Sequence, residues 1–536
     1  MKYDAIIIDG LISYKNLAFD FGIVNLRLNN DIMALPNLIE HFYPEKNESF
    51  ANRCLNLEDC GKLNGILLYD QLQKSGLECA LVSNLLENAD YLATLLAEGA
   101  RSVIISTTWL VDINEVKKVT QIVRSLNPGI PIIAGGVLVY NSYLTYLQRD
   151  NDDFDYRSAK NSFFFSNQDP QLSEDIDTFI IDRSGIQTLI KVLGAIKAKE
   201  TYLNLSNIAY YRGDELIINP QSPEEIVLDN QVISWDKIDS KYLPEILPMQ
   251  LSLGCNFGCK FCNFFHKRHC YTKSKEYIRR ELNWVRSRPE VRMIRFVDDS
   301  MPPKVLRDLC EIMIEEEINI PWTTFIRLDA LAKENFTLLQ EANCIDVQVG
   351  IESGDDRILK NMDKKATADK YLRILRDLAE FDMSIRASFI IGYPGENQES
   401  ISSTIDFINQ LPTDRNATFY IGLAPFVLLP LSPIFYESER KAYQLQGYFV
   451  DWQHESMSFN EVPDYLKKIF VSVKDDVLFA YTGDPMDINL PKAQTKKVKL
   501  SRQRYQKGIV AGASENELIG LESDLNVSLK EMEQLI

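Results

Sequence analysis

The sequence lacks an excess of positive charge. Of its 536 residues, 58 are Lys or Arg and 76 are Asp or Glu, so the formal net charge is −18. Proteins that bind nucleic acid neutralise phosphates with a basic face, and anionic membranes attract basic segments. The charge balance therefore argues against nucleic acid as a partner and against long-range attraction to a membrane surface.

Cysteine is also scarce for a chain of this length. The nine cysteines are too few for a disulfide scaffold, and an odd number with four between residues 251 and 270 fits a reducing, cytoplasmic location. The N-terminal MKYDAIIID places Asp4 and Asp9 around a short apolar run. We expect this run to be a first strand rather than part of a signal peptide.

One uncharged stretch approaches the length of a membrane span. Residues 419–436, FYIGLAPFVLLPLSPIFY, contain Pro425, Pro430 and Pro433. A helix that crosses a bilayer needs about 20 apolar residues, and prolines in its interior would break it. We therefore expect a buried strand followed by an irregular loop, and no membrane span.

Apolar runs of strand length alternate with helical patterns in two parts of the chain. Over residues 1–200 this alternation predicts an α/β fold with a doubly wound parallel sheet, which a polar insertion over 148–177 interrupts. Within it, Asp112 is expected to cap a helix that runs to about Leu126. Residues 201–248 resemble a small antiparallel element and a proline-containing linker.

A second α/β unit is expected over residues 249–436. The alternation there indicates a partial (β/α)6 barrel, with strands near 249–253, 293–297, 322–327, 345–351, 385–392 and 418–424. Residues 437–536 form a mainly helical C-terminal extension. Its basic stretch 492–508 is expected to be a solvated linker or, alternatively, a site for an acidic peptide or a phosphate.

Polar and small residues follow the predicted strands of the first unit. Ligands of doubly wound sheets bind at the carboxyl ends of the strands. In residues 1–200 these ends carry Asp9, Gly10, Ser106, Thr107, Thr108, Gly135 and Gly136. We therefore expect a binding site along this edge of the first sheet.

The segment CNFGCKFC carries three cysteines directly after the first strand of the second unit. Its C-x3-C-x2-C spacing can direct the thiolates of Cys255, Cys259 and Cys262 at one iron–sulfur cluster. The alternative is a closed tetrahedral zinc site completed by His266, His269 or Cys270. The single C-x2-C pair and the position at the rim of a barrel favour the cluster.

The cysteine motif, with the aromatic Phe261 before its last cysteine, resembles the signature of the radical S-adenosylmethionine (SAM) enzymes. Three further segments are similar to the motifs on that family's second, fourth and fifth barrel strands: IRFVDDSM (294–301), VGIESGDDRILKNMDKK (349–365) and FIIGYPGEN (389–397). The resemblance covers about 190 residues. It implies a [4Fe–4S] cluster on the three cysteines, with SAM bound at the open iron and cleaved to a 5′-deoxyadenosyl radical.

The resemblance also implies which residues contact SAM or support the cluster. These are Phe261, Asp298, Asp299, Arg327, Glu352, Ser353, Gly392 and Gly395. Other interpretations remain open from the residues alone. The aspartates suit a helix N-cap, Glu352 suits a buried ion pair with Arg327, and the two glycines suit a turn.

The first unit resembles the cobalamin-binding branch of the same family. The segments GKLNGILLYDQLQKSGLECALVSN, SVIISTTW and IPIIAGG are similar to that branch's helices and strands. Cobalamin would meet the strand ends at Ser106, Thr107, Thr108, Gly135 and Gly136.

Three features depart from that pattern. The D-x-H-x-x-G motif is missing, and DRSG (182–185) and LSPIFY (431–436) replace more typical segments. Because His41 is the sole histidine before His266, the resemblance implies cobalamin without a histidine ligand. The alternative is a domain that keeps the fold without the cofactor.

The expected activity is methylation of an unactivated carbon of a small molecule, a lipid precursor or a peptide. The resemblance implies an electron donor such as flavodoxin or ferredoxin. Within GYFVDWQHESMSFNE (447–461), His454 is a candidate general acid or base and equally a packing residue. A radical rearrangement, cyclisation or oxidation is the alternative reaction. A zinc-stabilised binding protein without enzymatic activity is the alternative of another class.

Overall fold

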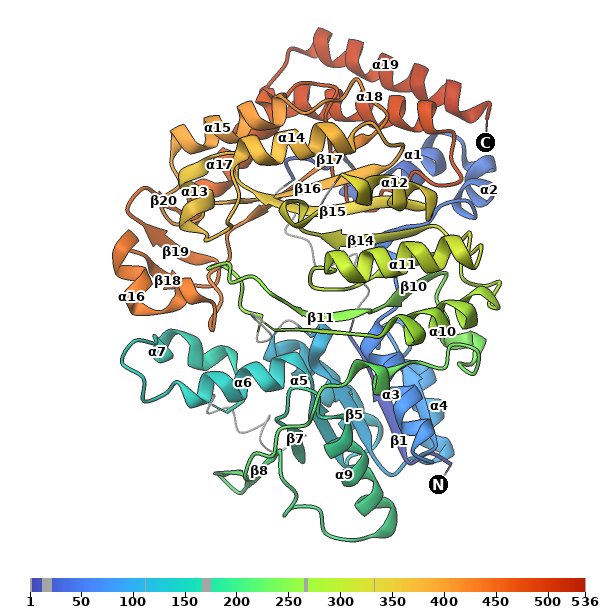
Figure 1. Cartoon of the computed structure of the whole chain (residues 1–536), viewed down its shortest axis with the longest axis vertical. Helices are drawn as coiled ribbons and strands as arrows, with labels where there is room; N and C mark the ends of the chain where they lie inside the picture. The colour runs from blue at the N-terminus through green and yellow to red at the C-terminus, as the bar shows by residue number, and fades with distance from the viewer. Residues whose placement is uncertain are drawn as a thin grey trace. The chain divides into compact units, whose positions relative to one another are not determined.

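The computed structural model describes residues 2–11, 22–110, 112–165, 175–264, 269–331 and 333–535. The chain divides into two compact units, which Figure 1 shows in the colours of the sequence. The first unit contains Met1–Asn16, Gly61–Leu243 and Pro430–Ser438. The second contains Leu17–Cys60, Pro244–Leu429 and Glu439–Ile536.

A mainly parallel sheet forms the centre of the first unit. Within the described residues it has seven strands in the order β4-β1-β5-β6-β7-β8-β9. The strands are β1 (Ala5–Ile8), β4 (Cys79–Val82), β5 (Val103–Ser106), β6 (Ile132–Gly135), β7 (Thr178–Ile180), β8 (Ile208–Arg212) and β9 (Glu215–Ile218). β1 and β4 to β7 are parallel, and the hairpin β8–β9 adds antiparallel strands at one edge. The predicted doubly wound sheet is confirmed.

Helices connect these strands as the periodicity predicted. They are α3 (Leu63–Lys74), α4 (Ala89–Glu98), α5 (Ile113–Leu126), α6 (Val137–Leu147) and α9 (Ile186–Ala198). The side chain of Asp112 accepts hydrogen bonds from the backbone N–H groups of Asn114 and Glu115, which confirms it as the N-cap of α5. Every residue of β1, β4 and β5 is buried, as expected for parallel strands covered by helices.

The second unit is built on a fully parallel sheet. Its order among the described residues is β10-β13-β14-β15-β16-β17-β21. The strands are β10 (Ile246–Met249), β13 (Met293–Phe296), β14 (Trp322–Ile326), β15 (Cys344–Glu352), β16 (Ser384–Ile391), β17 (Thr418–Pro425) and β21 (Leu478–Phe479). The helices between them are α10 (Lys275–Arg286), α11 (Pro303–Glu315), α12 (Glu334–Glu341), α13 (Asp356–Asn361), α14 (Ala368–Leu378) and α15 (Gln398–Asn409).

Alternating burial along β16 shows which face of this sheet is open. Ile385, Ala387 and Phe389 are fully buried, whereas Arg386 is half-buried and Ser388 is exposed. Successive side chains of a strand point to opposite faces, so one face carries the apolar core and the other carries the more polar residues. Functional side chains are therefore expected on the second face and at the carboxyl ends of the strands.

The first strand of this sheet lies earlier than predicted. Residues 249–253 were expected to form it, but β10 ends at Met249. The next strand, β11 (Ser252–Cys255), leaves the sheet and pairs antiparallel with β12 (His269–Thr272). The C-terminal part also adds β21, which pairs with β17 and which the expected six-stranded barrel did not include.

The units differ from the predicted domain boundaries of 1–200, 201–248, 249–436 and 437–536. The segment Leu17–Cys60 belongs to the second unit because its side chains are part of that unit's hydrophobic core. Residues 430–438 return to the first unit, where Phe154 pairs with Tyr436 in a β-bridge. The predicted linker largely completes the first sheet through β8 and β9.

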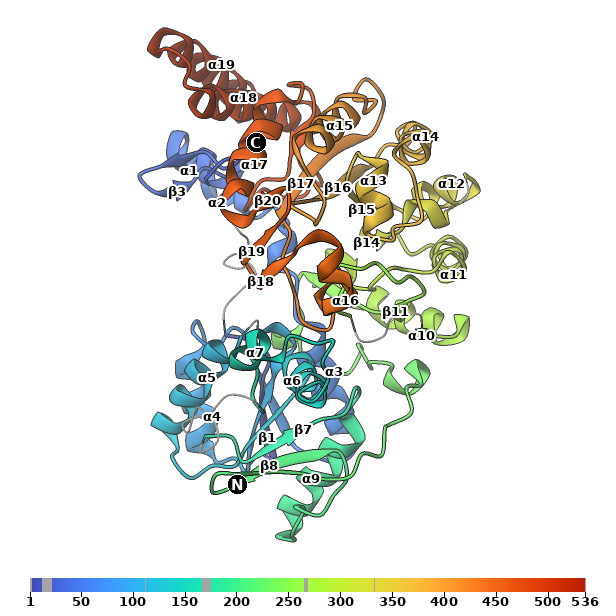
Figure 2. The ribbon, with the colours of Figure 1, turned by 90° about the vertical axis from the view of Figure 1, so that its left-hand side faces the viewer.

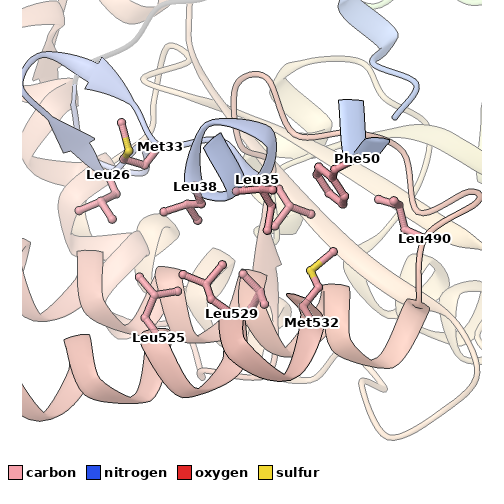
Figure 3. Close-up of a cluster of buried hydrophobic side chains, with 11 residues drawn as sticks. Leu26, Met33, Leu35, Leu38, Phe50, Leu490, Leu525, Leu529 and Met532 are labelled. Atoms are coloured by element: carbon pink, nitrogen blue, oxygen red, sulfur yellow. The ribbon is translucent and has the colours of Figure 1, made fainter. Parts of the chain in front are cut away.

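One core cluster joins the N-terminal segment to the C-terminal helices. The segment contributes α1 (Leu35–Phe42) and α2 (Asn47–Ala51), which lie beside α18 (Lys492–Ala511) and α19 (Glu515–Glu533) (Figure 2). Apolar side chains from both parts face one another (Figure 3). They are Leu26, Met33, Leu35, Leu38, Ile39, Phe50, Leu490, Val498, Leu525, Leu529 and Met532.

The basic stretch 492–508 is not a solvated linker, so that expectation was wrong, whereas binding of an acidic peptide or a phosphate there stays a prediction. It lies in α18, where Lys499, Arg502 and Lys507 are buried. Arg502 makes two hydrogen bonds to Asp484, at 2.7 and 2.6 Å, and Lys499 lies 2.7 Å from Asp487. Buried cations require such partners, and charge counting along the sequence did not reveal these carboxylates.

The uncharged stretch 419–436 contains the predicted buried strand, β17, followed by irregular chain. Among the described residues, no helix combines the length and the apolar character that a membrane crossing requires.

Candidate active site

The three cysteines of the C-x3-C-x2-C motif belong to the hairpin β11–β12, which follows the carboxyl end of β10. Cys255 lies opposite His269 in the hairpin register. Cys259 is buried, whereas Cys255 and Cys262 are half-buried. All nine cysteines lie in the described ranges and are free thiols, so none of these three is engaged in a disulfide.

Two aspartates at the end of β13 hold the base of this hairpin. Oδ1 of Asp298 accepts hydrogen bonds from the N–H groups of Leu251 (3.2 Å) and Ser252 and from the Ser252 hydroxyl (2.5 Å). Oδ2 of Asp299 accepts one from the N–H of Gly254 at 2.7 Å. Burial raises the pKa of Asp298 to about 7 and that of Asp299 to about 6.

These contacts give the aspartate pair a positioning role. The N-cap interpretation was wrong, because α11 begins after Pro302 and no side chain caps it. The predicted contact of Asp298 and Asp299 with SAM stays a prediction. Sequence reasoning found the residues but could not show that their oxygens face the backbone of the cysteine strand.

Arg327 lies against the middle cysteine of the motif. Its Nη1 donates a hydrogen bond to Sγ of Cys259 at 3.3 Å, and its guanidinium lies 3.7 Å from the ring centre of Phe257. Nε and Nη2 each lie 3.0 Å from a carboxylate oxygen of Asp329, and Nη2 also donates to the carbonyl of Lys364. This fork fixes a buried positive charge beside a predicted cluster ligand.

Glu352 is paired with Lys364, so the expected ion pair with Arg327 was wrong. The carboxylate and the ammonium lie 2.8 Å apart, and both side chains are buried. The sheet register shifts between Gly350 and Glu352, and Glu352 has a φ of 70°. A Cβ at position 350 would lie 2.2 Å from Oε1 of Glu352, so this close pair requires glycine there.

Ser353 follows Glu352 and is fully buried. Its hydroxyl accepts a hydrogen bond from the N–H of Asp355 at 3.2 Å and lies 3.5 Å from the hydroxyl of Thr404. The side chain therefore ties the end of β15 to α15. Its predicted contact with SAM stays a prediction.

Gly392 and Gly395 form a tight turn after β16, with φ values of 95° and 92°. A Cβ on Gly392 would lie 2.6 Å from the ring of Trp452. The N–H of Gly392 donates to Glu396 Oε2 at 2.5 Å, while Glu396 Oε1 is buried and has no hydrogen-bond partner in the described part of the chain. Burial raises the pKa of Glu396 to about 8. Sequence reasoning missed this carboxyl, although it stands directly after the second glycine.

His454 packs on the same turn. Its ring stacks on Trp452 with centres 5.4 Å apart, and Nε2 lies 3.3 Å from the carbonyl oxygen of Gly392. Because a carbonyl only accepts, Nε2 carries the proton and Nδ1 accepts from Ser456 (3.4 Å to its N–H). Burial lowers the pKa of His454 to about 4. These contacts match the packing alternative, and the catalytic role stays a prediction.

The three cysteine side chains are chemically suited to hold an iron–sulfur cluster. Three cysteines outside any disulfide lie on one hairpin, and a guanidinium already donates to one of the sulfurs. A closed zinc site would need a fourth ligand: His269 is exposed, the half-buried Cys270 lies near Cys255, and His266 lies outside the described residues. In the described part of the chain, no three His, Cys, Asp or Glu side chains are already grouped as metal ligands. Burial raises the pKa of Cys255.

The predicted strand-end residues of the first unit meet at one edge. β5 and β6 pair so that Ser106 lies opposite Gly135. The hydroxyl of Thr107 donates to the carbonyl of Gly135 at 2.9 Å. Gly136 has a φ of 104°, and a Cβ there would lie 3.0 Å from Oγ1 of Thr108. Gly135 and Gly136 place no Cβ at this part of the edge, where a ligand could approach the backbone closely, and the predicted contact of these residues with cobalamin stays a prediction.

Asp9 is buried at the same edge, at the end of β1. Its Oδ2 accepts a hydrogen bond from the Ser83 hydroxyl at 3.1 Å, and its Oδ1 has no hydrogen-bond partner among the residues that the structure describes. Burial raises the pKa of Asp9 to about 7. The residues assigned to this unit contain no histidine, because His41 lies in α1 of the second unit.

Comparison with known proteins agrees with this geometry. Residues 249–408 match the family model described as the Radical SAM superfamily. An uncharacterized methyltransferase of Pyrococcus horikoshii is 26% identical over 246 residues, which cover 44% of this chain and 53% of the relative. The anaerobic magnesium-protoporphyrin IX monomethyl ester cyclase of Synechocystis is 20% identical over 307 residues, or 55% of this chain and 60% of the relative. The chain thus spans little more than half the length of these relatives.

A solved structure resembles the whole chain in fold. The radical SAM methyltransferase TsrM of Kitasatospora setae, determined with cobalamin and a [4Fe–4S] cluster bound, has a TM-score of 0.59 and 12% sequence identity. The match covers 98% of this chain and 99% of TsrM. The second unit therefore contains a radical SAM domain. The fold of both units together is that of a radical SAM protein with an N-terminal cobalamin-binding-type domain, as the resemblance predicted.

Proposed function

We propose that the protein is a cobalamin-dependent radical SAM enzyme that methylates an unactivated carbon of a small molecule, a lipid precursor or a peptide. One observation carries the proposal. A hairpin with three cysteines outside any disulfide follows the first strand of the segment that matches the Radical SAM model, in a chain that shares the fold of a radical SAM methyltransferase whose structure holds cobalamin. The name of the Pyrococcus relative supports methyl transfer as the reaction.

Cys255, Cys259 and Cys262 would hold the cluster, and the strand-end edge around Gly135 and Gly136 would hold cobalamin without a histidine ligand. When bound, the cluster supplies the electron that cleaves SAM to a 5′-deoxyadenosyl radical, and cobalamin supplies the methyl group. The chain's own residues orient these groups.

We assign the buried charged residues of the second unit the role of positioning the cysteine strand and its sulfurs. Asp298 and Asp299 hold the cysteine strand, and Arg327 holds the sulfur of Cys259. Glu352 and Lys364 neutralise one another, so the end of β15 carries a compensated pair of buried charges. A radical site must exclude stray hydrogen donors, and the neutral His454 ring packs against that turn.

The reaction would use an electron donor such as flavodoxin or ferredoxin, and we propose a cytoplasmic location. Nine free thiols and an excess of 18 acidic charges support a reducing compartment and a partner other than nucleic acid.

Radical cyclisation or oxidation is the second candidate, supported by the name of the Synechocystis relative. The two reactions leave different SAM products. Methyl transfer produces S-adenosylhomocysteine together with 5′-deoxyadenosine, whereas cyclisation or oxidation produces 5′-deoxyadenosine alone. Quantifying both products from anaerobic, reconstituted enzyme with candidate substrates tests the proposal, and absence of S-adenosylhomocysteine would overturn it.

A further inference from the structure

The second unit contains a cavity of about 310 Å³ that the predicted active-site residues do not line. One wall is formed by β16 and β17, with Arg386 and Leu423. The other walls are formed by the N-terminal residues 23–25 and 57–58 and by residues 480–484, which follow β21. Its volume is at the lower end of the range for small-molecule sites.

Most polar groups in the cavity wall already have partners. The side chain of Asn25 bonds Thr482 twice, at 3.0 Å to the hydroxyl and at 3.2 Å from the backbone N–H. Asp484 is bound by both outer nitrogens of Arg502. The remaining wall is largely apolar, with Ile23, Val24, Leu57, Ile421, Leu423 and Leu466.

Glu58 differs from these groups. Its Oε1 accepts a hydrogen bond from the N–H of Gly483 at 3.0 Å, whereas Oε2 is buried and has no hydrogen-bond partner in the described residues. A carboxylate oxygen left unpaired in a buried position is costly. It gains stability when a ligand with N–H donors reaches it.

The charges around the cavity balance except at Glu58. Arg386 pairs with Asp346 at 2.8 Å, and Arg502 pairs with Asp484 at 2.6 Å. No ion pair to Glu58 is found among the described residues, so the cavity wall carries one uncompensated negative charge. This charge selects a cation and disfavours a carboxylate or phosphate.

We propose that this cavity binds a small molecule with a protonated amine and an apolar body. The ammonium group meets Glu58, and the apolar body lies against Ile421 and Leu423. This binding site goes beyond the proposed function and stands on the geometry of the second unit alone.

The binding test uses the full-length protein without added cofactors and three small probes of equal chain length. Ligand-observed NMR titrations compare butylammonium, 1-butanol and butyrate. We expect saturable binding of butylammonium, weaker binding of 1-butanol and none of butyrate. Non-saturable butylammonium binding, or preference for butyrate, would overturn the site.

Two variants locate the bound probe. Glu58→Gln keeps an acceptor for the N–H of Gly483 and removes the charge, so it should weaken butylammonium binding at least tenfold. The control Glu515→Gln removes an exposed charge on α19 and should leave binding unchanged. Leu423→Trp fills the cavity while keeping Glu58 and should abolish binding of both neutral and cationic probes. Unchanged affinity in both Glu58→Gln and Leu423→Trp would refute the assignment.

Discussion

Replacing Asp298 by alanine should release the base of the cysteine hairpin. The substitution leaves the N–H groups of Leu251 and Ser252 without their acceptor, and both residues are fully buried. A buried donor left unpaired costs about 1–3 kcal/mol. If the surrounding structure relaxes in part, the two unpaired N–H groups together cost about 2–4 kcal/mol. This cost raises the equilibrium constant for opening of the hairpin by a factor of about 30 to 1000.

Amide hydrogen exchange over residues 249–256 measures this opening, and alkylation of Cys255 reports it independently. The matched control is Asp298→Asn, which keeps one acceptor oxygen and should lose much less protection. If Asp298→Ala exchanged at the wild-type rate while the protein remained folded, the anchoring role of Asp298 would be refuted.

The same residue predicts a pH dependence. Burial raises the pKa of Asp298 to about 7, above the value of about 3.9 for an unfolded chain. A raised carboxyl pKa means that the folded state binds the proton more tightly, so its contribution to stability is complete below about pH 4 and is lost as pH rises through about 7. Protection of the hairpin, corrected for intrinsic exchange, should therefore fall between about pH 4 and pH 7 more in the wild type than in Asp298→Asn.

Three other substitutions test separate parts of the account. Arg327→Met removes the donor to the sulfur of Cys259, and we expect less iron retained after reconstitution and a more negative midpoint potential for the iron that binds, measured by a redox titration. Lys364→Met leaves Glu352 buried without its cation, which should lower the free energy of unfolding by about 3–5 kcal/mol in denaturant titrations, whereas a loss under 1 kcal/mol would contradict the pairing. Gly136→Ala introduces a Cβ at a positive φ and should weaken cobalamin binding, measured by absorbance, with the second unit's thermal unfolding unchanged.

Local patterns predicted most of the secondary structure because they reflect neighbouring residues. The alternation of apolar runs and helical periodicity predicted both parallel sheets, and Asp112 was identified as a cap from its position before the periodic segment. The spacing of the cysteines likewise predicted a loop with three thiols after a strand. These features depend on residues a few positions apart.

Features formed by distant residues could not be predicted in this way. The N-terminal segment joins the second unit through a core with α18 and α19, and Leu35 and Leu529 lie nearly 500 residues apart in sequence. The basic stretch 492–508 looked solvated because its partners, such as Asp484 for Arg502, become neighbours only in the folded chain.

In the candidate site, too, features that depend on neighbouring residues were predictable and contacts between distant residues were not. The segment VGIESG indicated Glu352 as a functional residue, but its partner was assigned to Arg327 because both stood near strand ends. The structure pairs Glu352 with Lys364, which lies beyond α13 and comes close to Glu352 only in the folded chain. Glu396 was missed because a single carboxyl after a glycine turn has no distinctive pattern, and its burial is a tertiary property.

The most direct test of the central claim is metal and product analysis of anaerobically reconstituted protein. For the wild type we predict about four irons and four sulfides per chain, co-purifying cobalamin, and formation of both S-adenosylhomocysteine and 5′-deoxyadenosine. Replacement of Cys255, Cys259 and Cys262 by alanine should remove the iron, the sulfide and both products. Stoichiometric zinc without sulfide in the wild type would contradict the account.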